Sequence, residues 1–170
     1  MNIYALSSGK GPSGIAIIRL SGKGTFKISK LIIKNKELNF SKINFCKFYN
    51  PKDSTLIDEG ILLGFPGPNS FTGEDLVEFH VHGSNAVIDH FLKILSEQED
   101  SRLAEPGEFT KIAFRNNKID LVEAESISDL IHSETELQRQ QAVKLVQGNA
   151  SNYYNNLREK LIKSLAYIEA

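Results

Sequence analysis

The stretch from Phe65 to Asp75 constrains the fold more than any other part of this 170-residue chain. It reads FPGPNSFTGED and runs directly into LVEFHVH at residues 76–82, which alternates like a β-strand. Each proline fixes its own φ and makes the preceding residue extended, and the glycines allow backbone angles that other residues resist. We therefore expect a rigid, shaped loop of the kind that positions functional groups, although the same composition would suit a crossover loop without a ligand.

The bulk composition is that of an ordinary globular protein, with 41% hydrophobic and 24% charged residues. The length suits one domain with a core, or one domain with a helical appendage. A net charge of −1 gives no reason to expect the whole chain to wrap nucleic acid. Six lysines nevertheless crowd the first third, and we interpret them as a solvated surface in preference to a phosphate-binding track: Lys27, Lys30, Lys34, Lys36, Lys42 and Lys47.

Cys46 is the only cysteine, so an intrachain disulfide and a cysteine-built metal site are both excluded. A single free thiol suits a reduced, cytoplasmic environment. The first residues lack the features of a secretory signal, and no apolar run approaches the roughly 20 residues of a membrane span. We therefore expect a cytoplasmic protein that is not embedded in a membrane.

Hydrophobic periodicity predicts a mixed α and β region followed by a helical one. Strands are expected at residues 3–6, 15–20, 43–49, 58–65 and 76–82, and helices at 25–33, 86–95, 109–115 and 121–131. The second of these helices is expected to be capped by Ser84 or Asn85. One polar helix of about 55 Å is expected from residue 133 to the end, with a break near Gly148 as the alternative. Because its apolar pattern stops unfinished at Ala170, we expect a fragment of a longer protein.

Residues 9–14 satisfy the G-x-G-x-x-G pattern, but Gly14 leads into the strand-like IAII and not into a helix. A dinucleotide site needs that helix to receive the pyrophosphate, so we reject this interpretation. No Gly-Lys pair is followed by Ser or Thr, so a Walker A loop is missing as well. No Ser-His-Asp or Cys-His arrangement can be placed, and we predict no catalytic residue.

Glu78, His80 and His82 are expected to share one face of their strand because side chains alternate. A metal site is the less favoured interpretation, since a third and a fourth ligand cannot be named. We favour a polar pocket with Glu78 as its anionic anchor.

Arg19 ends a strongly apolar strand and needs a partner, because an unpaired buried charge is costly. It either makes a structural ion pair or recognises a carboxylate or carbonyl group of a ligand. Lys118 lies at a predicted helix junction, from which its amine could reach into a cleft, although a plain surface lysine is the simpler interpretation.

Four ordered motifs resemble the N-terminal region of the bacterial and organellar tRNA modification GTPase family (MnmE/TrmE). They are GIAIIRLSG at residues 14–22, the loop at 65–75, PGEF at 106–109, and NKIDL at 117–121 with its continuation to Glu125. The resemblance covers essentially the whole chain. One departure is that Gly83-Ser84-Asn85 stands where the family often has Gly-Gly-Pro.

This resemblance implies an α+β domain at residues 1–118, like the folate-binding domain of glycine-cleavage aminomethyltransferases, followed at 119–170 by the first helices of an all-α domain. It also implies that the first domain binds a tetrahydrofolate derivative, in the 5-formyl or 5,10-methylene form, and forms a homodimer. Arg19, Glu78 and Lys118 match the family's folate-contacting arginine, glutamate and lysine.

In this family the full-length protein also carries a GTPase domain, which binds GTP, Mg²⁺ and K⁺, and a C-terminal cysteine that Cys46 does not match. With an FAD-dependent partner it installs aminomethyl-type groups at C5 of the wobble uridine of tRNA. We expect this chain to retain only folate binding and dimerisation. Whether the chain by itself is an enzyme is left open. Two alternatives remain: a stand-alone folate-dependent aminomethyl transfer enzyme, and a structural dimerisation module with an empty pocket.

Overall fold

The structure, a computed structural model, describes residues 1–9, 11–34 and 38–169. Lys10, Lys36 and Ala170, which figure in the expectations above, lie outside the described residues. The chain divides into two compact units, residues 1–113 and 114–170, and each is described by itself. None of the described helices is both long enough and apolar enough to cross a membrane.

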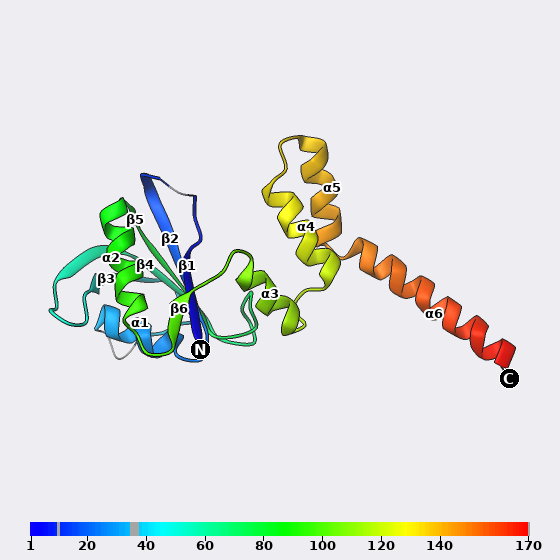
Figure 1. The fold of residues 1–170 in the computed structure, drawn as a ribbon, viewed down its shortest axis with the longest axis horizontal. Coiled ribbons are helices and arrows are strands. Elements are labelled where there is room, and N and C mark those ends of the chain that lie inside the picture. Colours follow the sequence, from blue (N-terminus) through cyan, green and yellow to red (C-terminus); the bar gives the residue numbers. More distant parts are fainter. Residues whose placement is uncertain (10, 35–37, 170) are drawn as a thin grey trace. The chain divides into compact units, whose positions relative to one another are not determined.

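The first unit is built on a six-stranded sheet in the order β3-β4-β5-β2-β1-β6 (Figure 1). Neighbouring strands run antiparallel except for the parallel pair β1–β6. The strands are β1 (Asn2–Leu6), β2 (Ser13–Ser21), β3 (Asn44–Tyr49), β4 (Leu56–Phe65), β5 (Leu76–Gly83) and β6 (Ser101–Leu103). The mixed α and β fold and the five expected strands are confirmed. β6 was missed because three residues are too few to show an alternating pattern.

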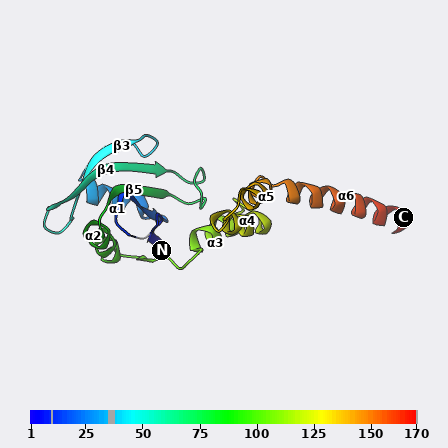
Figure 2. The same ribbon diagram turned by 90° about the horizontal axis from the view of Figure 1, so that it is seen from above.

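Two helices, α1 (Thr25–Ile33) and α2 (Asn85–Ser96), lie on one side of this sheet (Figure 2). Both helices were expected, and Ser84 caps α2 by accepting a hydrogen bond from the backbone N–H of Val87 at 3.2 Å. Between helices and sheet, the ring of Phe48 makes edge-on contacts with Phe79 and Phe91 at centroid distances of 5.8 and 5.3 Å. All three rings are fully buried, so this cluster is the centre of the core.

The second unit is helical and contains α4 (Leu121–Ile131), α5 (Glu136–Val146) and α6 (Asn149–Glu169), while α3 (Glu108–Arg115) crosses the division between the units. The expectation of one helix from residue 133 onward is wrong. α5 begins at Glu136, three residues later than expected, where Thr135 forms a capping box with Gln138. The chain turns at Gly148, whose φ of 76° suits glycine, so the alternative of a break at this position is confirmed.

The sheet face away from α1 and α2 carries the residues of the predicted pocket. In the register of β2, β5 and β4, Arg19 lies beside Glu78 and Glu78 beside Leu63. Two residues farther along the strands, on the same face, Ile17 lies beside His80 and His80 lies beside Ile61. The residues between them, including Val77 and Phe79, are buried against the helices. As predicted, Glu78, His80 and His82 therefore share the face opposite the core.

Strands β4 and β5 approach so closely at Gly60 that a side chain does not fit there. A Cβ atom built on Gly60 would lie 2.1 Å from the backbone oxygen of His80. We predict that Gly60→Ala lowers the free energy of unfolding by about 1–3 kcal/mol, since the two strands must separate to admit the methyl group. Urea unfolding of both proteins measures the difference.

Gly14→Ala is the matched control, because Gly14 also lies in a strand and its added Cβ would meet no atom within 4 Å. This variant should unfold at the same urea concentration as the unmodified protein or slightly above it. Equal loss of stability in both variants would contradict the close approach at Gly60.

A paired carboxylate fixes the start of α3. Glu108 accepts hydrogen bonds from both terminal nitrogens of Arg102, one of them at 2.8 Å, and from the backbone N–H of Glu105 at 2.8 Å. The hydrogen bond from Arg102 is the main reason why the pKa of Glu108 falls from its ordinary 4.5 to about 2. The first turn of α3 is thereby tied to β6.

We predict that Glu108→Gln destabilises the first unit at neutral pH and that this difference disappears in acid. The pKa of Glu108 is lower in the folded state than in the unfolded state, so its contribution is complete above about pH 4.5 and is lost as the pH falls toward about 2. Thermal unfolding of both proteins across this range measures the change. A difference in stability that is as large near pH 2 as at neutral pH would exclude the ion pair as its cause.

Candidate functional site

The candidate site is centred on an ion pair between the two central strands of the sheet. Arg19 on β2 donates to Oε1 of Glu78 on β5 from Nη2 at 2.7 Å and from Nε at 3.0 Å. The side chains are only 26% and 14% exposed, so Glu78 is the partner that this arginine was expected to need. Both guanidinium donors meet the same oxygen. The other oxygen, Oε2, has a longer contact of 3.4 Å with Nε2 of His80.

Two phenylalanines lie against the guanidinium group. The ring centroids of Phe71 and Phe109 are 5.7 and 5.4 Å from Cζ of Arg19, within the range of cation–π contacts. Phe71 comes from the loop at residues 66–75 and Phe109 from the first turn of α3. Sequence reasoning had not assigned these residues to the site, although each stands inside one of the motifs that carry the family resemblance.

The proline-glycine loop is held to the end of β2 by hydrogen bonds. Asp75 accepts from the backbone N–H of Gly67 at 3.0 Å through its side chain, and from that of Gly22 at 2.9 Å through its backbone oxygen. The hydroxyl groups of Ser21 and Thr72 lie 2.8 Å apart, and both residues are fully buried. The loop is therefore shaped and anchored, as predicted, and this places the neighbouring Phe71 over Arg19.

The two histidines of β5 serve different partners. His80 contacts Glu78, whereas Nδ1 of His82 lies 2.8 Å from Oδ1 of Asp58 and its backbone N–H donates to Oδ2 at 2.7 Å. Burial alone would raise the pKa of Asp58, but the hydrogen bonds from His82 outweigh it and the pKa is lowered. Asp58 is thus a stable anion that orients His82 at the far end of the strand.

Metal and thiol chemistry find little support in the described part of the first unit. Within the described ranges, no group of three or more His, Cys, Asp or Glu residues is arranged to hold a metal ion. Burial raises the pKa of the Cys46 thiol to about 11. This cysteine is therefore protonated at neutral pH and is a poor nucleophile and a poor ligand.

An apolar hollow adjoins His80 on the same face. Ile15, Phe45 and Ile61 line it, with a volume of about 220 Å³. Ile15 and Phe45 are 65% and 76% exposed, which is unusual for side chains of this size in strands. The uncovered face of the sheet is thus polar around Glu78 and apolar toward β3.

Lys118, the third residue predicted for the site, lies in the second unit between α3 and α4. It is exposed and lines a hollow of about 270 Å³ together with Asp120 and Glu123. The preceding Asn117 has a φ of 54°, which turns the chain sharply before α4. The structure thus brings Arg19 and Glu78 together in the first unit and places Lys118 in the second.

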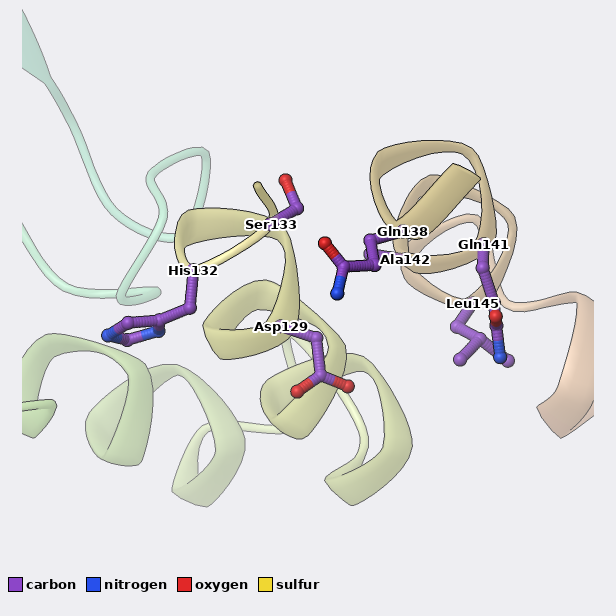
Figure 3. Close-up of a pocket in the computed structure, with 7 residues that line it drawn as sticks. All are labelled: Asp129, His132, Ser133, Gln138, Gln141, Ala142 and Leu145. Carbon is purple, nitrogen blue, oxygen red and sulfur yellow. The ribbon is translucent and has the colours of Figure 1, made fainter. Parts of the chain in front are cut away.

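A further hollow of about 270 Å³ lies between α4 and α5, lined in part by Asp129, His132 and Gln138 (Figure 3). Its polar groups serve the ends of the helices. The side-chain oxygen of Gln138 accepts from the backbone N–H of Thr135 at 2.9 Å, and Nδ1 of His132 lies 2.8 Å from the backbone oxygen of Ser128. We therefore regard this hollow as part of the helix–turn–helix structure and assign it no ligand.

Comparison with known proteins identifies the chain's relatives. Residues 2–118 match the family model described as GTP-binding protein TrmE N-terminus, and residues 121–170 match the MnmE helical domain. The chain is 56% identical over 171 residues to the tRNA modification GTPase MnmE of Pelagibacter ubique, covering 100% of this chain and 38% of that protein.

More distant relatives agree. The chain is 45% identical to the mitochondrial tRNA modification GTPase gtpbp3 of Dictyostelium discoideum, covering 99% of this chain and 34% of that protein. It is 44% identical to MnmE of Mesorhizobium japonicum, covering 99% of this chain and 38% of that protein. The chain thus spans little more than a third of the length of these curated relatives. Since the family models match nearly all of it, this chain belongs to the tRNA modification GTPase family.

Proposed function

We propose that the chain binds a tetrahydrofolate derivative at Glu78, Arg19 and Lys118, forms a homodimer, and in this way serves the modification of tRNA. In this proposal the folate-binding and dimerisation domain comprises residues 1–118. Its fold is related to the fold of the folate-binding domain of glycine-cleavage aminomethyltransferases. Residues 119–170 begin a helical domain. The observation that carries the proposal is the pair formed by Arg19 and Glu78, flanked by two aromatic rings on an uncovered sheet face.

The chemistry of Glu78 suits the edge of a pterin ring. That edge presents adjacent N–H donors, and an ionised carboxylate offers about four acceptor positions on its two oxygens. Arg19 occupies Oε1 through two hydrogen bonds, which leaves acceptor positions mainly on Oε2. Hydrogen bonds from a ligand to a charged carboxylate are stronger than those to a neutral acceptor.

The neighbouring groups suit the rest of the ligand. Phe71 and Phe109 offer aromatic surface beside the carboxylate, against which a flat heterocycle can pack. The cationic groups of Arg19 and Lys118 match the carbonyl groups and the glutamate tail of folate. We propose no catalytic residue and no metal for this chain.

For the whole protein we propose the activity of the family: with GTP, Mg²⁺ and K⁺ bound to a further domain, and with an FAD-dependent partner, it modifies C5 of the wobble uridine of tRNA in the cytoplasm. The names of the relatives, which all describe tRNA modification GTPases, support this proposal. A stand-alone aminomethyl transfer enzyme is less well supported, because it requires an acid or base in the pocket that we cannot name.

We predict that the chain binds 5-formyltetrahydrofolate saturably and that Glu78→Gln weakens binding by about 100-fold. The amide keeps an oxygen for Arg19 but replaces an acceptor with an N–H group, and a hydrogen bond to a charged group contributes about 1.5–3 kcal/mol. Glutamine is preferable to alanine, which would leave Arg19 partly buried without its partner. Isothermal titration calorimetry measures both affinities, and the 5,10-methylene form can be compared in the same way.

Glu59→Gln is the matched control. Glu59 lies on β4, is paired with Lys47 at 3.0 Å, and makes no contact with Arg19 in the described structure. This variant should bind with unchanged affinity. A folded protein that binds no folate would refute the proposal and favour the structural module, and full binding by Glu78→Gln would remove Glu78 from the site.

The apolar hollow of Ile15, Phe45 and Ile61 is the surface that we propose for the homodimer. These side chains are exposed on the uncovered face next to the edge strand β3. An exposed aromatic side chain flanked by aliphatic ones is the usual composition of an interface centre. Dimerisation through this patch would bring the second copy next to His80 and hence close to the Glu78 pocket.

We predict that Phe45→Ser weakens dimerisation at least about tenfold, because truncating a central aromatic side chain removes much of the binding energy of an interface. Sedimentation velocity at tens of micromolar protein measures the population of dimer. Leu31→Ser is the control, since Leu31 is 47% exposed but belongs to α1 on the other side of the sheet. An unmodified chain that stays monomeric would refute the dimer, and an equal effect of Leu31→Ser would place the interface elsewhere.

A further inference from the structure

Four lysines lie along α1 and at its two ends: Lys23, Lys27, Lys30 and Lys34. Lys27 and Lys30 lie within the helix, Lys23 precedes its N-cap Gly24, and Lys34 is its C-cap with a φ of 53°. All four are exposed. The helix itself, TFKISKLII, contains no acidic residue. We call these four residues the lysine stripe.

Two members of the stripe are held above aromatic rings. Nζ of Lys30 lies 5.8 Å from the ring centroid of Phe40, and Nζ of Lys34 lies 4.8 Å from that of Tyr49. Phe40 is in turn stacked on Phe26 at 4.0 Å. These contacts limit the freedom of two long side chains, so less conformational entropy is lost when their ammonium groups bind an anion.

The ammonium groups of the stripe are available to bind an anion. In the part of the chain that the structure describes, no carboxylate forms an ion pair with any of the four lysines. Other lysines of the same unit do form such pairs, Lys47 with Glu59 at 3.0 Å and Lys52 with Glu97 at 3.1 Å. The net charge of −1 therefore conceals a local excess of positive charge on one helix.

Acidic residues limit the stripe on one side. A hollow of about 530 Å³ separates Lys23 and Lys27 from a wall that contains Glu97, Glu99 and Asp100. An extended anion cannot bind across this wall without repulsion. It can bind along α1 toward Lys30 and Lys34, where the aromatic rings lie.

We propose that the lysine stripe contacts the phosphate backbone of tRNA. This inference rests on the proposed function for the identity of the partner, and on the structure for the surface. A row of exposed ammonium groups suits a polyanion with regularly spaced charges, and such contacts position an RNA without reading its sequence. From the sequence alone, the lysines of this region were interpreted as a solvated surface, and this proposal gives those on α1 a binding role.

The experiment measures the binding of a fluorescent tRNA transcript to this chain at several salt concentrations. We compare the unmodified chain with a triple variant, Lys27→Gln, Lys30→Gln and Lys34→Gln. Each phosphate contact contributes about 0.7–0.9 to the slope of log K against log salt concentration, so the variant should lose about 2 from that slope. Its affinity for 5-formyltetrahydrofolate should not change.

The matched control is Lys144→Gln, Lys160→Gln and Lys163→Gln, which removes the same charge from exposed positions of α5 and α6. The salt slope of this control should equal that of the unmodified chain. Equal slopes for all three proteins, equal losses in both variants, or no tRNA binding near 50 mM salt would each overturn the proposal. If the triple variant still bound tRNA as the unmodified chain does but no longer bound phosphatidylserine vesicles, the stripe would be assigned to a membrane surface instead.

The two proposals fail separately. Loss of folate binding by the unmodified chain refutes the proposed pocket and leaves the salt dependence of tRNA binding as it is. An unchanged salt slope in the triple variant refutes the stripe and leaves the calorimetry of Glu78→Gln as it is.

Discussion

The ion pair between Arg19 and Glu78 is the interaction on which the rest of the site depends. The register of β2 and β5 places the two residues side by side, and both are largely withdrawn from water. Neither charge is tolerable there alone, because removing one partner leaves the other partly buried and uncompensated. The same two strands bury Leu20 and Val77 on the opposite face. Core and site are therefore two faces of one pair of strands, and the core fixes the geometry of the site.

Three carboxylates near the site have different tasks. Asp75 binds backbone N–H of the loop that carries Phe71, and Glu108 binds Arg102 at the start of the helix that carries Phe109. Both are occupied in holding aromatic residues against Arg19. Glu78 is paired with Arg19 itself, and its second oxygen has only a long contact, to His80. The two structural carboxylates thus hold the surroundings of Arg19 rigid, and Glu78 remains able to accept hydrogen bonds from a ligand.

Much of this was predictable from the sequence, for identifiable reasons. The alternation of β5 placed Glu78 opposite the core, and the apolar strand around Arg19 required a partner for its charge. The partner itself was not predictable, because pairing depends on the register between strands that are 59 residues apart. Phe71 and Phe109 were missed because they reach Arg19 from a loop and a helix, and the way these pack on the sheet depends on contacts between residues far apart in the sequence. The break between α4 and α5 was expected, but α5 begins three residues later than predicted because Thr135 caps it with Gln138.

The helices α1 and α2 separate the two surfaces to which we assign ligands. Glu78 lies on the sheet face away from α1 and α2, and these two helices, with the lysine stripe along α1, lie on the other side of the sheet (Figure 2). A polyanion along α1 therefore neither blocks the pocket nor meets the carboxylate of Glu78, which would repel it. The negative charge that we propose to bind a pterin edge and the positive charges that we propose to contact phosphates can coexist in one small unit, because a layer of helices and a sheet keep them apart.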